Sequence, residues 1–145
     1  MALSDQEKRV VAALGQTMFP RDSVLGIDGE DARVVPWVED YLGRMPPFSR
    51  AQIRGLLSTF EFGYAAWAGR PRDTFSAARP DARAAYLESW ERSSTYTQRM
   101  LYEALRAMMT FAYVESEPVA EAIRPPGDEA STQVGTEAPR AAEEA

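Results

Sequence analysis

The chain has 145 residues, of which 45% are hydrophobic and 26% charged, and its net charge is -6. This length fits one globular domain that can bury a sizeable core. The acidic balance argues against nucleic acid as a partner, because phosphate binding requires basic surface. No apolar run approaches the roughly 20 residues that span a bilayer, so we expect no membrane insertion.

The sequence contains neither cysteine nor histidine. Disulfides, thiolate zinc sites and cysteine nucleophiles are therefore excluded, and the commonest general base is missing. We expect no catalytic, cofactor-binding or metal-binding residues on this chain. The N-terminal segment shows neither a signal peptide nor a twin-arginine motif. A cytoplasmic location is the default expectation, and a periplasmic one applies if a signal segment had been removed.

The first predicted helix has a clear beginning and end. Ser4 and Glu7 form a capping box that opens it, and Pro20 closes it. Residues 20–30 bear two glycines and several acids. Their spacing misses the calcium-binding pattern of an EF-hand, so a solvated loop is favoured over a calcium site.

Two more helices are predicted before residue 70. The first runs from Asp31 to Met45 and is interrupted by the prolines that follow. The second begins at a capping box that starts with Ser49, and it stops at Gly69. Both carry apolar residues at helical spacing, which predicts one buried face on each.

The second half of the chain predicts a central helix with shorter helices around it. Pro80 opens a helix in its first turn. Thr95 begins a third capping box, ahead of a helix over residues 97–114 that is apolar nearly all round. Such a helix is expected to be buried on several sides. Ser116 caps one further short helix.

The composition changes after Arg124. The remaining segment lacks apolar periodicity and is rich in Pro, Ala, Glu and Gly. This composition predicts a disordered acidic tail over residues 125–145. Residues 1–124 then form an all-α domain, a single compact bundle of about five or six helices around the central apolar helix.

Some side chains invite a catalytic interpretation. Asp81, Glu88 and Glu91 are candidates for paired carboxylates in acid–base chemistry. They alternate with arginines on the outer face of a helix, which favours weak surface ion pairs instead. The aromatic residues fall mostly on core faces, so packing is favoured over a ligand pocket.

Some apolar surface exceeds what a small core requires. Phe62 lies off the main apolar stripe of its helix. Tyr102, Met109 and Tyr113 form a second stripe on the central helix, and Trp90 is a core or interface anchor. Surplus apolar surface of this kind predicts a partner-binding patch. We therefore predict partner contacts at these five residues.

Two stretches carry a resemblance to a known family. FSAARPDARAAYLESWERSS (residues 75–94) and TQRMLYEALRAMMTFAYVESEPVAEAI (residues 97–123) resemble the gluconate 2-dehydrogenase subunit 3 family. These are small helical subunits that accompany large flavin-dependent dehydrogenases of the glucose–methanol–choline type. The likeness spans roughly residues 3–123. The matching features are Phe75, Arg83, Leu87, Trp90, Ser93, Arg99, Leu105, Ala112-Tyr113, Glu117-Pro118-Val119 and Ile123.

The resemblance implies a partner rather than a reaction. In such complexes the FAD, any electron relay and the substrate site lie on other chains. This chain would be a non-catalytic accessory subunit of a hetero-oligomer, with a chaperone-like role in the folding, maturation or assembly of the large flavoprotein subunit. Arg79 stands where the family usually has a Ser or Thr cap, and the twin-arginine signal is missing. The missing signal favours a cytoplasmic stabilising role over an export role.

Two alternatives from other classes stay open. One is a self-contained helical adaptor or regulatory protein unrelated to redox chemistry, which is expected to purify as a well-behaved monomer. An orphaned subunit is instead expected to aggregate or to bind hydrophobic dye. The other is an enzyme that uses carboxylates or a bound cofactor.

Overall fold

The computed structural model describes residues 3–126, which form six α-helices joined by loops. The helices are α1 (Asp5–Met18), α2 (Val34–Arg44), α3 (Pro47–Ala68), α4 (Pro80–Glu91), α5 (Tyr96–Val114) and α6 (Glu117–Ile123). Between residues 3 and 126 there is no β-strand, so the all-α prediction is confirmed. The predicted acidic tail lies outside the described residues except for its first two positions.

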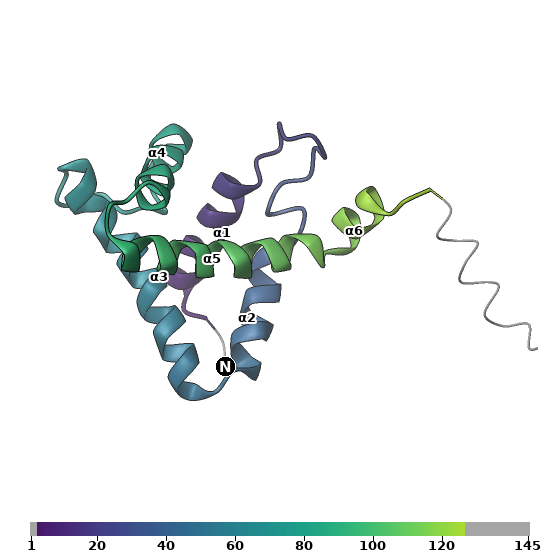
Figure 1. Cartoon of the computed structure of the whole chain (residues 1–145), viewed down its shortest axis with the longest axis horizontal. Helices are drawn as coiled ribbons and strands as arrows, with labels where there is room; N and C mark the ends of the chain where they lie inside the picture. Colours follow the sequence, from purple (N-terminus) through teal and green to yellow (C-terminus); the bar gives the residue numbers. More distant parts are fainter. Residues whose placement is uncertain (1–2, 127–145) are drawn as a thin grey trace, which may run out of the picture.

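Two helices share the middle of the bundle. α1 packs against α2, α3 and α4, whereas α5 packs against α2, α4 and α6. Figure 1 shows α5 running across the face nearest the viewer, in front of α1 and α3. Every helix contributes buried apolar side chains to one core. α5 is thus a central helix of the bundle, but the expectation that it is buried on several sides is wrong, because Met100, Phe111 and Val114 on one side of it are at least 40% exposed.

The capping box at the start of α1 is confirmed, and it does more than cap. The Glu7 amide donates to Ser4 Oγ at 3.2 Å, and the Ser4 amide donates to Glu7 Oε2 at 2.8 Å. Glu7 Oε1 also accepts a hydrogen bond of 2.6 Å from Arg54 Nε, which ties α1 to α3. Burial raises the pKa of Glu7, but the bonds from Arg54 and Ser4 outweigh it and hold that pKa below its usual value.

The predicted capping box at Ser49 is wrong. α3 begins at Pro47, and Ser49 already lies in its first turn. Proline is favoured at a first helical position because its fixed φ suits the helix and its missing amide is not needed there. Arg50 instead closes the preceding helix, since its Nε donates to the Leu42 carbonyl at 2.8 Å and its Nη2 to the Met45 carbonyl at 2.9 Å.

The predicted caps at Thr95 and Ser116 are only half right. Both residues occupy N-cap positions, but within residues 3–126 neither side chain makes a capping bond. Ser93 Oγ accepts from the Thr95 amide at 3.1 Å, so the side chain two residues before Thr95 holds the turn that precedes α5. Ser116 Oγ donates to the Tyr113 carbonyl at 2.7 Å, which closes α5 rather than opening α6.

The acidic loop before α2 is held by its own charges. Asp28 Oδ1 accepts from the Asp31 amide at 2.7 Å, and Arg21 forms ion pairs with both aspartates. Gly29 is needed for close packing, because a Cβ there would lie 2.6 Å from the Gly15 carbonyl carbon. The part of the chain that the structure describes holds no group of three or more acidic side chains placed to bind a metal ion.

Candidate interaction surface

The five residues predicted to contact a partner do not share one surface. Phe62 is 58% exposed on α3. Trp90, Tyr102, Met109 and Tyr113 are all at most 7% exposed. A buried side chain cannot offer surface to a second protein without unfolding its surroundings. The structure therefore leaves the contact prediction standing for Phe62 and favours a packing role for the other four.

Contacts explain why two of these four side chains lie inside. Trp90 stacks on Phe60, with ring centroids 4.3 Å apart. Tyr113 stacks on Phe19 with centroids 4.0 Å apart, and its hydroxyl donates to the Ile27 carbonyl at 2.7 Å. This single side chain thus holds the loop before α2 against α5. Burial raises the pKa of the Tyr113 phenol, so the hydroxyl keeps the proton that it donates.

The exposed apolar surface of α5 lies on the side of the helix opposite Tyr102, Met109 and Tyr113. Met100 is 51% exposed, Phe111 62% and Val114 40%. Ala104 and Ala107 are exposed between them. We call these five residues the α5 seam. Their spacing alternates between four and three positions, as in the contact line of a coiled coil, so the surface that fits them best is another helix.

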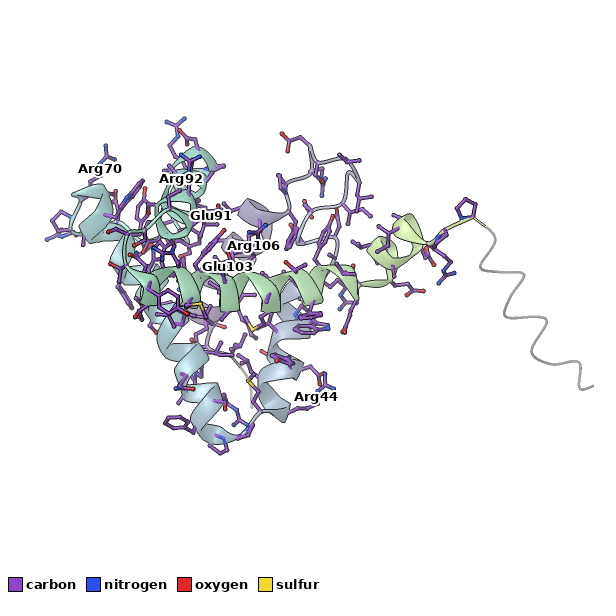
Figure 2. All side chains as sticks on the ribbon, viewed as in Figure 1. Arg44, Arg70, Glu91, Arg92, Glu103 and Arg106 are labelled. Carbon is purple, nitrogen blue, oxygen red and sulfur yellow. The ribbon has the colours of Figure 1, made fainter. Side chains whose placement is uncertain are left out.

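The two flanks of the α5 seam differ in chemistry. Leu101 extends the apolar surface on one flank and is 41% exposed. The other flank carries Glu103 and Arg106, whose Oε1 and Nη1 atoms lie 3.7 Å apart. Arg106 Nη1 also lies 3.6 Å from Glu91 Oε1 on α4. Figure 2 shows these three side chains together where α4 lies beside α5.

A second uncovered surface lies on α3, and it contains no charge. We call it the α3 face. Its exposed residues are Phe48, Ala51, Gln52, Gly55, Ser58, Thr59, Phe62 and Ala66. They fall within one side of the helix, because their positions repeat every three or four residues. The outer side of a surface helix is normally its charged side. In α3 the uncharged side faces outward instead.

The charged residues of α3 point toward the rest of the molecule. Arg50 closes α2 and Arg54 binds Glu7, as described above. Glu61 is 1% exposed, and its Oε1 accepts from the Ser76 amide at 3.3 Å and from Ser76 Oγ at 2.7 Å. These bonds fix the loop between α3 and α4 to the inner side of α3.

Several residues that match the family pattern shape this loop and the next turn. Arg83 Nε donates to the Phe75 carbonyl at 3.2 Å, and its Nη2 donates to the Ser76 carbonyl. Burial lowers the pKa of Arg83, and the neighbouring Glu61 opposes that effect. Arg99 Nη1 donates to the Ser93 carbonyl at 2.6 Å. These arginines close backbone turns, so their role is to position helices.

The carboxylates weighed as an acid–base pair lie in surface ion pairs. The pairs join Glu88 to Arg92 at 3.0 Å, Glu91 to Arg106 at 3.6 Å and Asp81 to Arg79 at 3.7 Å. All three carboxylate side chains are at least half exposed. Their arrangement supports the interpretation as a solvated helix surface. Exposed pairs of this kind contribute on the order of 0.5 kcal/mol each.

The fold and its two uncovered helix surfaces are typical of a small helical protein that works in contact with another protein. The family described as Gluconate 2-dehydrogenase subunit 3 matches residues 5–125, and the chain belongs to this family. The family is named for a subunit of a dehydrogenase complex, which implies a hetero-oligomeric partner. No curated protein and no solved structure matches the chain. Across residues 3–126, every helix is too short or too polar to span a bilayer.

Proposed function

We propose that this chain is a non-catalytic accessory subunit that binds a large FAD-dependent sugar or alcohol dehydrogenase subunit. FAD, the substrate site and catalysis are assigned to that partner, and both chains to the cytoplasm. A ligand that binds only the folded state of a protein stabilises it by mass action. By this route the small subunit would support folding, maturation and assembly of the flavin-loaded large subunit.

The observation that carries the proposal is the uncharged α3 face. Covering this face with another protein removes no charged side chain from water, so the desolvation cost of binding is small. Protein interfaces are depleted of charge at their centre and enriched in aromatic residues. Phe48 and Phe62, which are 75% and 58% exposed, supply those aromatics. Family membership supports a dehydrogenase subunit as the partner, and the lack of charge supports this face as the proposed contact.

The first test is capture of the partner. The full chain is expressed with an affinity tag in its native host, purified gently, and the eluate is examined by gel and absorption spectroscopy. A stoichiometric larger chain that brings flavin absorption with it is the expected result. A colourless, monodisperse monomer would contradict the proposal and favour the adaptor alternative.

Substitution of Phe62 tests the assigned face. Phe62→Asp places a charge at the centre of the α3 face, and we expect it to lower flavoprotein capture at least about tenfold. Because the side chain is largely exposed, the melting temperature should change little. Val24→Asp is the matched control, since Val24 is fully exposed in the loop before α2. Undiminished capture by the Phe62 variant would remove the α3 face from the proposal.

A further inference from the structure

We propose that the α5 seam is the contact surface of a reversible homodimer, in which α5 of a second copy lies antiparallel across it. This pairing is separate from the dehydrogenase partner, which is assigned to the α3 face. The seam is open to such a contact, since all five of its residues are exposed. α5 itself crosses the near face of the molecule in Figure 1.

The spacing of the α5 seam is self-complementary when two copies run in opposite directions. A two-fold axis midway between Ala104 and Ala107 sets each of these alanines opposite the other in the second copy. The same axis sets Met100 opposite Phe111. Small residues at the crossing allow the helix axes to approach to roughly 8 Å. The methionine and phenylalanine then form sulfur–aromatic contacts on both sides of the crossing.

The flanks of the seam match in the same register. With a rise of about 1.5 Å per residue, Glu103 lies roughly 3 Å along the axis from Arg106 of the second copy. Two-fold symmetry produces this opposite-charge pair twice. The other flank adds the apolar Leu101 of each copy, which is 41% exposed. A parallel two-fold pair would instead turn the charged flank of each copy toward the Leu101 flank of the other, so Glu103 and Arg106 would have no opposite charge across the contact.

The contact is small, so the dimer is expected to be weak. The seam offers five residues per copy, far fewer than the roughly 20–30 residues a side of a standard interface. We expect a dissociation constant on the order of 10 μM. The dimer would therefore form and separate readily, and it leaves the α3 face uncovered.

Sedimentation equilibrium of the full chain tests the association. Concentrations from about tenfold below to about tenfold above the expected dissociation constant should show a shift from monomer to dimer. A chain that stays monomeric over this range overturns the proposal. A trimer or larger assembly overturns it as well, because a two-fold contact closes at two copies.

Charge reversal tests the register. Glu103→Arg and Arg106→Glu should each weaken the dimer at least about tenfold, because each sets like charges opposite one another twice. The double variant should restore the affinity to within about twofold, since it rebuilds the same pairs with their signs exchanged. Asp22→Arg, in the exposed loop before α2, is the control. Failure of the double variant to restore dimerisation would overturn the register.

Cysteine pairing tests the direction of the second helix. The native chain has no cysteine, so an introduced thiol has no competing partner. In an oxidised mixture of Ala104→Cys and Ala107→Cys chains, the mixed disulfide should form faster than either like pair. Faster formation of the like pairs would indicate parallel helices and overturn the proposal. Glu103→Arg should still capture the flavoprotein, whereas Phe62→Asp should still dimerise, so the two proposals fail separately.

Discussion

The two longest helices, α3 and α5, place their charged side chains on opposite sides. α3 has 22 residues and turns Arg50, Arg54 and Glu61 toward the rest of the molecule. α5 has 19 residues and keeps Glu103 and Arg106 exposed. The inner side of α5 is instead apolar and aromatic. Each helix leaves an outer surface suited to another protein, but the α3 surface is wholly uncharged and the α5 surface has a charged flank.

This difference shows two ways of fixing a helix in a small bundle. The inward charges of α3 make directional bonds to specific atoms: Arg50 to the end of α2, Arg54 to Glu7 at the start of α1, and Glu61 to the loop before α4. Such bonds specify orientation, because only one rotation of the helix satisfies them. α5 is fixed mainly by the fit of its buried side chains and by the bond from the Tyr113 hydroxyl to the Ile27 carbonyl. Its orientation therefore depends on how well its buried side chains fill the core.

The largest expected effect tests which side of α5 is the inner side. Met109→Ala removes a fully buried side chain, and we expect it to lower the free energy of unfolding by about 3–4 kcal/mol. Met100→Ala makes the same chemical change on the exposed seam and should cost less than about 0.5 kcal/mol. Urea unfolding of both variants measures the difference. Equal losses would mean that the two methionines do not lie on opposite sides of the helix.

Much of the fold could be predicted from local signals. The capping box at Ser4, the glycine at position 69 and the proline at position 80 mark the ends of helices that the structure confirms. The capping-box pattern at Ser49 predicts the wrong beginning for α3. Pro47, two residues earlier, is a better first residue for the helix. The capping motif is short, so a stronger neighbouring signal overrides it.

The candidate surface was harder to predict, for a physical reason. α5 is apolar on nearly every side, so helical periodicity defines two stripes without saying which one faces inward. Tyr113 on the buried stripe donates to the carbonyl of Ile27 in a distant segment, and no local pattern reveals such a bond. The exposure of Phe62 could be predicted because this aromatic residue stands apart from a clear stripe. The alternating spacing of the α5 seam is a sequence signal for the exposed contact line of this helix.

The second test removes one of the inward charges of α3. Glu61→Ala deletes the acceptor of both Ser76 bonds and leaves the partly buried guanidinium of Arg83 without its neighbouring negative charge. We expect a loss of about 2–3 kcal/mol in the free energy of unfolding. Glu61→Gln keeps a carbonyl acceptor for Ser76 and should cost about 1–2 kcal/mol. Thermal or urea unfolding measures both variants.

An outer-face substitution on the same helix serves as the control for Glu61. Thr59→Ala removes a hydroxyl that donates to the Gly55 carbonyl at 2.9 Å on the exposed side of α3. This substitution should change the free energy of unfolding by less than about 0.5 kcal/mol. A Glu61→Ala variant as stable as the Thr59 variant would show that inward charges do not fix α3. The contrast with α5 would then rest on packing alone.

The smallest expected effect concerns Glu7 and its dependence on pH. Glu7→Gln keeps the capping box, because glutamine also accepts in that motif, but it removes the charge that binds Arg54. We expect a loss of about 1–2 kcal/mol at neutral pH. The folded-state pKa of Glu7 lies below its ordinary value of 4.5. Its charge therefore stabilises the fold fully above that value, and the contribution disappears as the pH falls through the folded-state pKa.

The free energies of unfolding of the native chain and of Glu7→Gln should accordingly differ at about pH 7 and converge at about pH 2. These two pH values lie on either side of the titration of Glu7. Asp40→Asn is the matched control. Its carboxylate pairs with Arg44 at 2.8 Å, but both side chains are at least 70% exposed, so less than about 0.5 kcal/mol is expected at any pH. A gap between the native chain and Glu7→Gln that stays constant down to low pH would assign the loss to packing. The inward charge of Arg54 would then have no part in joining α3 to α1.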